Sequence, residues 1–116
     1  MAEPIEAMLR FRNANTLIAA MARRLRVRDD IGFICECADE DCLGTIRLSL
    51  EEFSDLRERQ LHFIVMPSHD ARCGDACETV EDGPTYQLLE ATGPSAAIAR
   101  LLDPARRDGR RVAAAA

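Results

Sequence analysis

The 116-residue sequence contains no lysine and no tryptophan, and aromatic residues make up only 4% of it. It also lacks an apolar run near the roughly 20 residues that a membrane-crossing helix needs, an internal repeat, and the H-E-x-x-H pattern of zinc proteases. These absences exclude a membrane span, a repeat array, a collagen and a large multidomain enzyme. A chain of this size with few aromatic residues buries a small core, so we expect an additional stabilising element.

The net charge of −5 is unevenly distributed along the sequence. Residues 1–28 carry six arginines against two glutamates, residues 29–99 carry sixteen acidic residues against four arginines, and residues 100–116 carry five arginines against two aspartates. The acidic middle would repel phosphate groups, which disfavours nucleic-acid binding by that region. The arginine-rich ends leave contact with nucleic acid as an alternative.

The cysteine content favours a metal or redox site over disulfides. The sequence begins with acidic residues, and its apolar run from Thr16 to Ala22 is short and bordered by arginines, so we expect no secretory signal and a cytoplasmic location. Thiols stay reduced in that compartment, and there are five of them, an odd number.

The spacing of apolar residues predicts an α+β fold, with a single domain over residues 1–103 and a flexible tail over residues 104–116. A long helix is expected over residues 3–28, which either covers the core or docks a partner. A small, mainly antiparallel sheet is expected from four short strands, at residues 33–37, 45–48, 61–66 and 86–91. Two shorter helices complete the prediction, one from a Ser49–Glu52 capping box to about residue 60 and one over residues 96–102.

Between the last two strands, residues 68–84 are polar and predict an exposed loop with a short helical turn near residues 75–81. In the final helix, we expect Ile98, Leu101 and Leu102 to face inward.

Three cysteines within eight residues are the strongest chemical signal. Residues two apart in a strand project to one face, so Cys35 and Cys37 can point to the same place, and the acidic turn after them can bring back Cys42. Three thiolates form a zinc-type donor set that needs a fourth ligand for tetrahedral coordination. His69, which follows the strand over residues 61–66, is the candidate, and the site predicts structural Zn²⁺.

The neighbouring polar residues receive other roles. Four acids in the cysteine segment are expected to point to water, because a Cys₃His zinc site already carries a negative charge: Glu36, Asp39, Glu40 and Asp41. Asp70 is a candidate hydrogen-bond acceptor for the imidazole of His69. Cys73 and Cys77 are alternative ligands, a redox pair or ordinary cysteines, and His62 is expected to be a partly exposed side chain.

Several segments resemble a family of small uncharacterised proteins, mainly from actinobacteria, with the pattern F-x-C-E-C-x4-C followed by P-G-H-E. The matching segments are residues 33–42, 48–53, 62–65 and 67–70, and the resemblance extends over about residues 5–102. This sequence has Ser68 where the pattern has glycine, Asp70 for glutamate and His62 for arginine. The resemblance supports the metal ligands and implies no particular activity.

These features predict a non-enzymatic, zinc-binding regulatory module that docks a protein partner through its N-terminal helix. A thiol or zinc redox sensor and a nucleic-acid-associated transcription regulator are alternatives. A zinc hydrolase with His69, Glu36 or Asp70 as base is less favoured, because thiolate ligands lower the Lewis acidity of the metal. Oligomeric state does not follow from the sequence.

Overall fold

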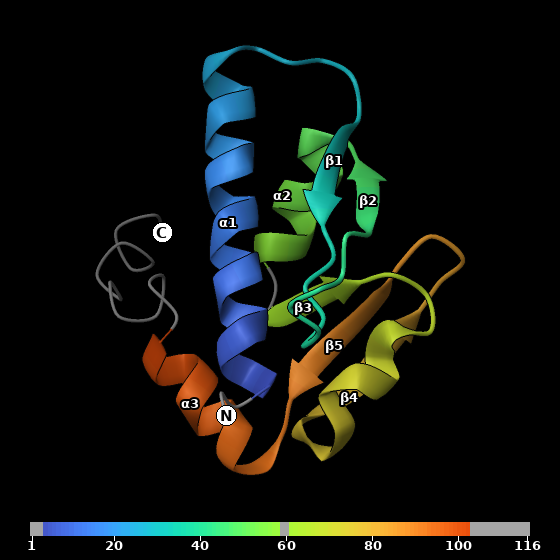
Figure 1. Cartoon of the computed structure of the whole chain (residues 1–116). Helices are drawn as coiled ribbons and strands as arrows, with labels where there is room; N and C mark the ends of the chain where they lie inside the picture. Colours follow the sequence, from blue (N-terminus) through green and yellow to red (C-terminus); the bar gives the residue numbers. More distant parts are fainter. Residues whose placement is uncertain (1–3, 59–60, 103–116) are drawn as a thin grey trace.

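The computed structural model describes residues 4–58 and 61–102 of the chain, and in these parts it confirms the α+β class. The expected tail over residues 104–116 lies outside the described residues. The elements are the helices α1 (Pro4–Arg24), α2 (Leu50–Glu58) and α3 (Gly93–Leu102), the 3₁₀ helix η1 (His69–Ala76), and the strands β1 (Ile31–Ile34), β2 (Thr45–Leu48), β3 (His62–Val65), β4 (Cys77–Asp82) and β5 (Gln87–Ala91). Figure 1 shows α1 as the longest element, with the strands along one side of it.

Helix α1 ends at Arg24, four residues before the predicted end at residue 28. The reason is a Schellman motif, in which the amide of Val27 donates to the carbonyl of Ala22 (3.0 Å) and the amide of Arg26 donates to that of Arg23 (3.2 Å). Arg26 has the left-handed conformation of this motif, with φ of 56°. Glycine is the usual residue at this position, and its absence removed the sequence signal for the helix end.

The strands form two antiparallel sheets where the sequence predicted one. Strands β1 and β2 form a hairpin, and β5 lies between β3 and β4 in the second sheet. Strand β4 and η1 occupy the segment predicted as a loop. The β4 side chains are exposed from Glu78 to Asp82 and show no apolar alternation, as is common for an edge strand protected by charge.

Helix α2 begins where the capping box predicts. The amide of Glu52 donates to the hydroxyl of Ser49 (3.0 Å), and the amide of Ser49 donates to the carboxylate of Glu52 (2.9 Å). The helix then packs Phe53 flat against Phe33 of β1, with ring centroids 4.2 Å apart.

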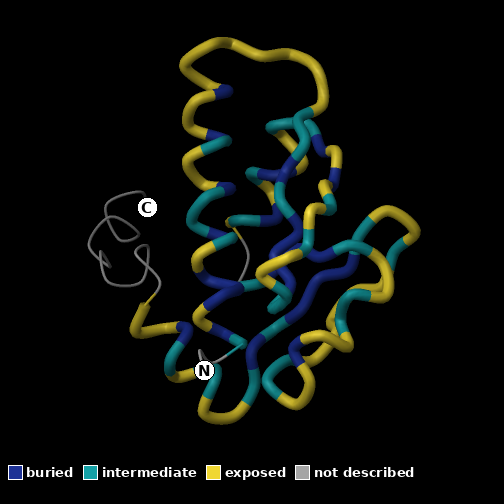
Figure 2. The backbone as a smooth tube through the Cα atoms, viewed as in Figure 1, coloured by how far each residue is buried: buried dark blue, intermediate teal, exposed yellow. Residues whose placement is uncertain are grey.

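Two hydrophobic clusters form the core. The first joins the start of α1 to β3, β5 and α3, and the second joins β1, β2 and α2 to the middle of α1 and to the same sheet. Strand β5 is therefore buried along most of its length (Figure 2). In α3 the buried residue is Ala99, whereas Leu101 and Leu102 are exposed, so the predicted inward orientation of these two leucines is wrong.

None of the helices in the described part of the chain combines the length and apolar character required to cross a membrane.

Candidate metal centre

The cysteine loop, residues 35–44, connects the two strands of the hairpin and reaches the second sheet. The sequence predicted Cys35 and Cys37 inside a strand over residues 33–37. Strand β1 ends at Ile34, so both cysteines lie just after it. The loop is held by two backbone hydrogen bonds, from Cys35 to the carbonyl of Gly44 (3.1 Å) and from Glu36 to the carbonyl of Ile64 in β3 (2.8 Å). These bonds place the cysteines beside β3.

His69 reaches the same place because the chain turns sharply after β3. Ser68 has a φ of 72°, in the left-handed region, and the amide of His69 donates to the carbonyl of Met66 (3.0 Å). Glycine adopts this conformation without steric cost, whereas serine does not. The turn directs the imidazole back toward the cysteine loop.

The structure brings together the four predicted ligands, Cys35, Cys37, Cys42 and His69, in a cluster that could hold a metal ion. Their ligand atoms all lie within 4.8 Å of one another. The Nδ1 atom of His69 is 3.4 Å from the sulfur of Cys35 and 3.7 Å from that of Cys42. A tetrahedral zinc ion with ordinary bond lengths separates sulfur from nitrogen by about 3.6 Å. The arrangement therefore fits such an ion.

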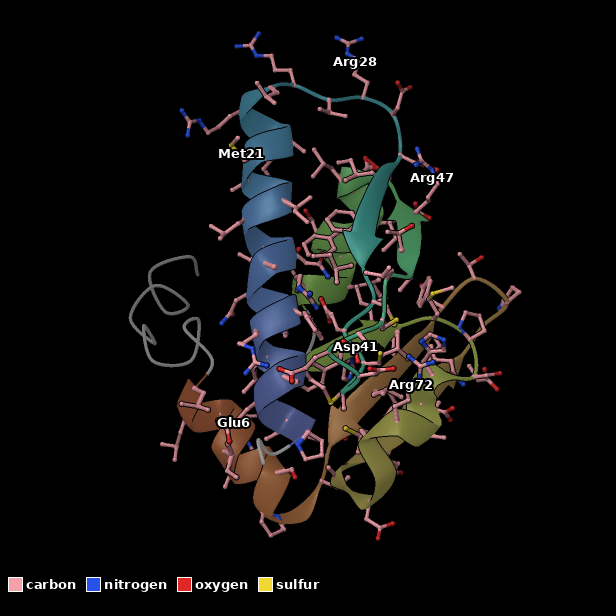
Figure 3. All side chains as sticks on the ribbon, viewed as in Figure 1. Glu6, Met21, Arg28, Asp41, Arg47 and Arg72 are labelled. Atoms are coloured by element: carbon pink, nitrogen blue, oxygen red, sulfur yellow. The ribbon has the colours of Figure 1, made fainter. Side chains whose placement is uncertain are left out.

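Two donors outside the ligand set contact the thiol sulfurs. The backbone amide of Met66 donates to the sulfur of Cys35 (3.2 Å), and the guanidinium of Arg72 donates to that of Cys37 (3.6 Å). Arg72 also pairs with the carboxylate of Asp39 at 3.2 Å. Figure 3 labels Arg72 on η1 and Asp41 in the cysteine loop. A divalent ion bound by three thiolates and a neutral imidazole would leave one negative charge, which the guanidinium of Arg72 would offset.

Sequence reasoning missed Arg72, because nothing in its spacing relates it to the cysteines. The hydrogen bond to Cys37 raises the pKa of its guanidinium further above its usual value. The contact arises only when η1 packs against the loop.

The surroundings shift the pKa values of Cys35, Cys42 and His69 in different directions. Burial raises the pKa of the Cys35 thiol to about 12. Burial also pushes the pKa of Cys42 upward, but hydrogen bonds from Gly44, Cys37 and Cys35 and the charge of Arg72 outweigh it and hold that pKa below its usual value. Burial and Arg72 lower the pKa of His69, so the imidazole is neutral at neutral pH. A neutral imidazole is the form that binds a metal.

Glu36 does not point to water, contrary to the prediction. Its side chain is 0% exposed and pairs with the guanidinium of Arg57. It also accepts hydrogen bonds from the side-chain amide of Asn15 (2.7 Å) and from the backbone amide of Ile64 (2.8 Å). The burial cost of this carboxylate is thus offset by a full set of donors. The sequence offered one indication of this burial, because Asn15 and Arg57 are polar residues on the inner faces of two helices.

The other acidic residues of the cysteine loop were also predicted to point to water, and most of them do. Glu40 and Asp41 are exposed, Glu40 pairs with Arg10 of α1, and Asp39 is half-buried. Among the described residues no hydrogen bond joins Asp70 to His69, and the carboxylate of Asp70 accepts one from the hydroxyl of Thr79 (2.9 Å). The predicted role of Asp70 as acceptor for the imidazole is therefore not the arrangement in the structure.

Cys73 and Cys77 lie outside the cluster found among the described residues. They contact each other, and the hydrogen bond from Cys77 holds the pKa of Cys73 below its usual value. The sulfur of Cys77 also lies 3.7 Å from that of Met8. These contacts do not support a ligand role, and a redox role stays a prediction. His62 is half-buried, with its imidazole 3.8 Å from the carboxylate of Glu90.

Comparison of the chain with protein-family models, with curated proteins and with solved structures returned no match. The resemblance to the actinobacterial family therefore stays a prediction. The assignment of the metal centre rests on the geometry and chemistry of the four side chains.

Proposed function

We propose that the protein is a non-enzymatic module in which a structural Zn²⁺, bound by Cys35, Cys37, Cys42 and His69, fixes the fold, and α1 docks a protein partner. Zinc suits three thiolates and one imidazole at tetrahedral spacing. Four protein ligands leave the ion no open position for a water or substrate, which argues against hydrolysis.

The observation that supports docking is an exposed apolar face on the second half of α1. We define the docking face as Leu17, Met21 and Leu25, which are 68%, 54% and 70% exposed. They recur every fourth residue, so they lie on one side of the helix and its final turn. Met21 points away from the strands and α2 in Figure 3. Single exposed apolar residues are ordinary, but three in a row form a surface for another helix or a groove.

The charge around the docking face indicates the chemistry of the partner. Four exposed arginines lie at the end of α1 and in the segment after it: Arg23, Arg24, Arg26 and Arg28. Arg28 and Arg47 lie at the same end of the molecule in Figure 3. A protein surface with an apolar centre and an acidic rim would complement this region.

The experiment is affinity capture from the native cell with the intact, zinc-loaded chain as bait. Deletion of residues 1–28 is unsuitable, because it would remove the buried residues Ile5, Met8 and Leu9 along with the docking face. The test variant is Leu17→Ser with Met21→Ser, and the matched control is Leu101→Ser, an equally exposed leucine on α3. Loss of one stoichiometric partner with the test variant alone supports docking. Equal capture by both variants contradicts it.

A thiol redox sensor is the second candidate, favoured by the contact between Cys73 and Cys77. This function predicts a disulfide between these two cysteines after mild peroxide treatment, detected by mass spectrometry of alkylated protein. Full alkylation of both thiols after treatment would contradict it.

A further inference from the structure

We infer that metal binding controls how firmly the docking half of α1 is held, and that the buried carboxylate of Glu36 couples the two. The inference rests on the proposed docking function but is tested without a partner. Glu36 is a positioning residue here, since it lies between two metal ligands and does not belong to the ligand set itself.

The first step is the position of Glu36 in the cysteine loop. Cys35 and Cys37 flank it directly, so an ion bound by both sulfurs fixes the backbone on either side of Glu36. The side chain is outside the ligand cluster and is fully buried, with Asn15, Arg57 and Ile64 as its donors. A movement of this backbone would pull a buried carboxylate away from its partners, and an unpartnered buried charge is costly.

The second step is the contact with α1. Asn15 lies in the middle of the helix, is 0% exposed, and uses both ends of its amide. Its Nδ2 donates to Glu36 (2.7 Å) and to the carbonyl of Ile34 (2.8 Å), and its Oδ1 accepts from the amide of Ile34 (2.8 Å). The helix is thereby fastened to the residues immediately before and after Cys35.

The third step is how little else holds the helix beyond Asn15. From residue 16 to the end of α1, the fully buried side chains are the small ones of Ala19 and Ala22, and Ile18 packs partly buried against the second cluster. Arg23 adds a hydrogen bond to the hydroxyl of Ser54 at the surface. Figure 2 shows this half of α1 mostly exposed. The Asn15–Glu36 contact is therefore the principal polar anchor next to the docking face.

Release of the metal should thus loosen the cysteine loop, then the Glu36 contacts, and then the second half of α1. Linkage requires the reverse effect as well, so a ligand that fixes α1 should tighten metal binding. The protein would present an ordered docking face only when the metal is bound.

The test is hydrogen–deuterium exchange of the full chain, with Zn²⁺ and after removal of Zn²⁺ by a chelator in the presence of reductant. In the zinc-free protein we expect residues 16–24 to exchange at least about tenfold faster than the amides of β5, because the second half of α1 opens locally while the fold around β5 persists. In Glu36→Gln, residues 16–24 should exchange rapidly even with zinc bound, and competition with a chromophoric chelator should show an affinity about tenfold weaker.

The matched control is Glu40→Gln, which removes the same charge from the same loop but at an exposed ion pair with Arg10. It should behave as the wild type in both measurements. If Glu36→Gln fails to fold, Asn15→Ala replaces it, since that variant keeps the Glu36–Arg57 pair and removes the hydrogen bonds that join α1 to Glu36 and Ile34.

Two results would overturn the inference. One is exchange over residues 16–24 that does not respond to the metal. The other is equal exchange of residues 16–24 and β5 in the zinc-free protein, which would mean that the whole fold opens together and that no local contact couples the metal to α1. Failure of the docking experiment would leave this result unaffected, because no partner enters the measurement.

Discussion

The two halves of α1 are used for different purposes. The first half buries Ile5, Met8 and Leu9 in the core beside β3 and β5. The second half buries two alanines and exposes Leu17 and Met21. One continuous helix thus provides a core element at one end and a free apolar face at the other. Hydrophobic spacing alone does not distinguish these uses, because both halves carry large apolar residues at helical intervals.

The largest expected effect comes from loss of the metal, which releases the cysteine loop that contacts α1 through Glu36 and Asn15. In Cys37→Ser we expect the free energy of unfolding to fall by about 4 kcal/mol when wild-type protein is saturated with zinc at about a thousand times its dissociation constant. Urea denaturation followed by circular dichroism measures it. Cys77→Ser, outside the cluster, should cost about 1 kcal/mol or less. An equal loss of unfolding free energy in the two variants would show that no metal at the cluster stabilises the fold.

Leucine-to-alanine substitutions compare the two halves directly. Leu9 is 3% exposed and Leu17 is 68% exposed. Leu9→Ala should lower the free energy of unfolding by about 3 kcal/mol through the cavity it leaves. Leu17→Ala should change it by about 0.5 kcal/mol or less. Comparable values from urea denaturation would mean that the second half is also part of the core.

Lowering the pH should weaken metal binding gradually, because protons compete with the metal for the thiols. Because burial raises the pKa of Cys35 to about 12, this thiol is protonated at neutral pH without metal. Zinc must displace that proton, so the apparent affinity should fall by about tenfold for each pH unit lowered between pH 8 and 6, for each proton released. Chelator competition across this range gives the slope, and a pH-independent affinity would show that no buried thiol is a ligand.

The smallest effect concerns the turn that delivers His69. Ser68→Gly should raise the free energy of unfolding by about 0.5 kcal/mol, since glycine avoids the steric cost of the left-handed conformation but gains freedom in the unfolded chain. Ser95→Gly, inside α3, should instead lower it by about 0.5 kcal/mol. Thermal denaturation of both zinc-loaded variants compares the signs, and a destabilising Ser68→Gly would contradict the turn geometry.

Local signals predicted much of the fold. The capping box at Ser49 placed the start of α2, and the apolar run at residues 61–66 contains β3. The cluster was predictable because cysteine and histidine have few other reasons to occur at such spacing. The end of α1 was missed because Arg26 adopts a conformation that glycine usually signals.

Other features depend on tertiary contacts that spacing does not reveal. Strand β4 forms from polar residues because β5 offers it a partner edge. Glu36 resembles the acids that follow it in the sequence, yet Asn15 and Arg57 approach it from two helices and make its burial possible. Arg72 meets Cys37 only after η1 has packed.

The central claim is that one metal ion is held by three sulfurs and one imidazole nitrogen. X-ray absorption spectroscopy of the protein purified with its native metal tests it most directly. The account predicts one zinc per chain with three sulfur neighbours at about 2.3 Å and one nitrogen at about 2.0 Å. Substoichiometric metal, or a shell in which oxygen replaces a sulfur or the imidazole nitrogen, would contradict it.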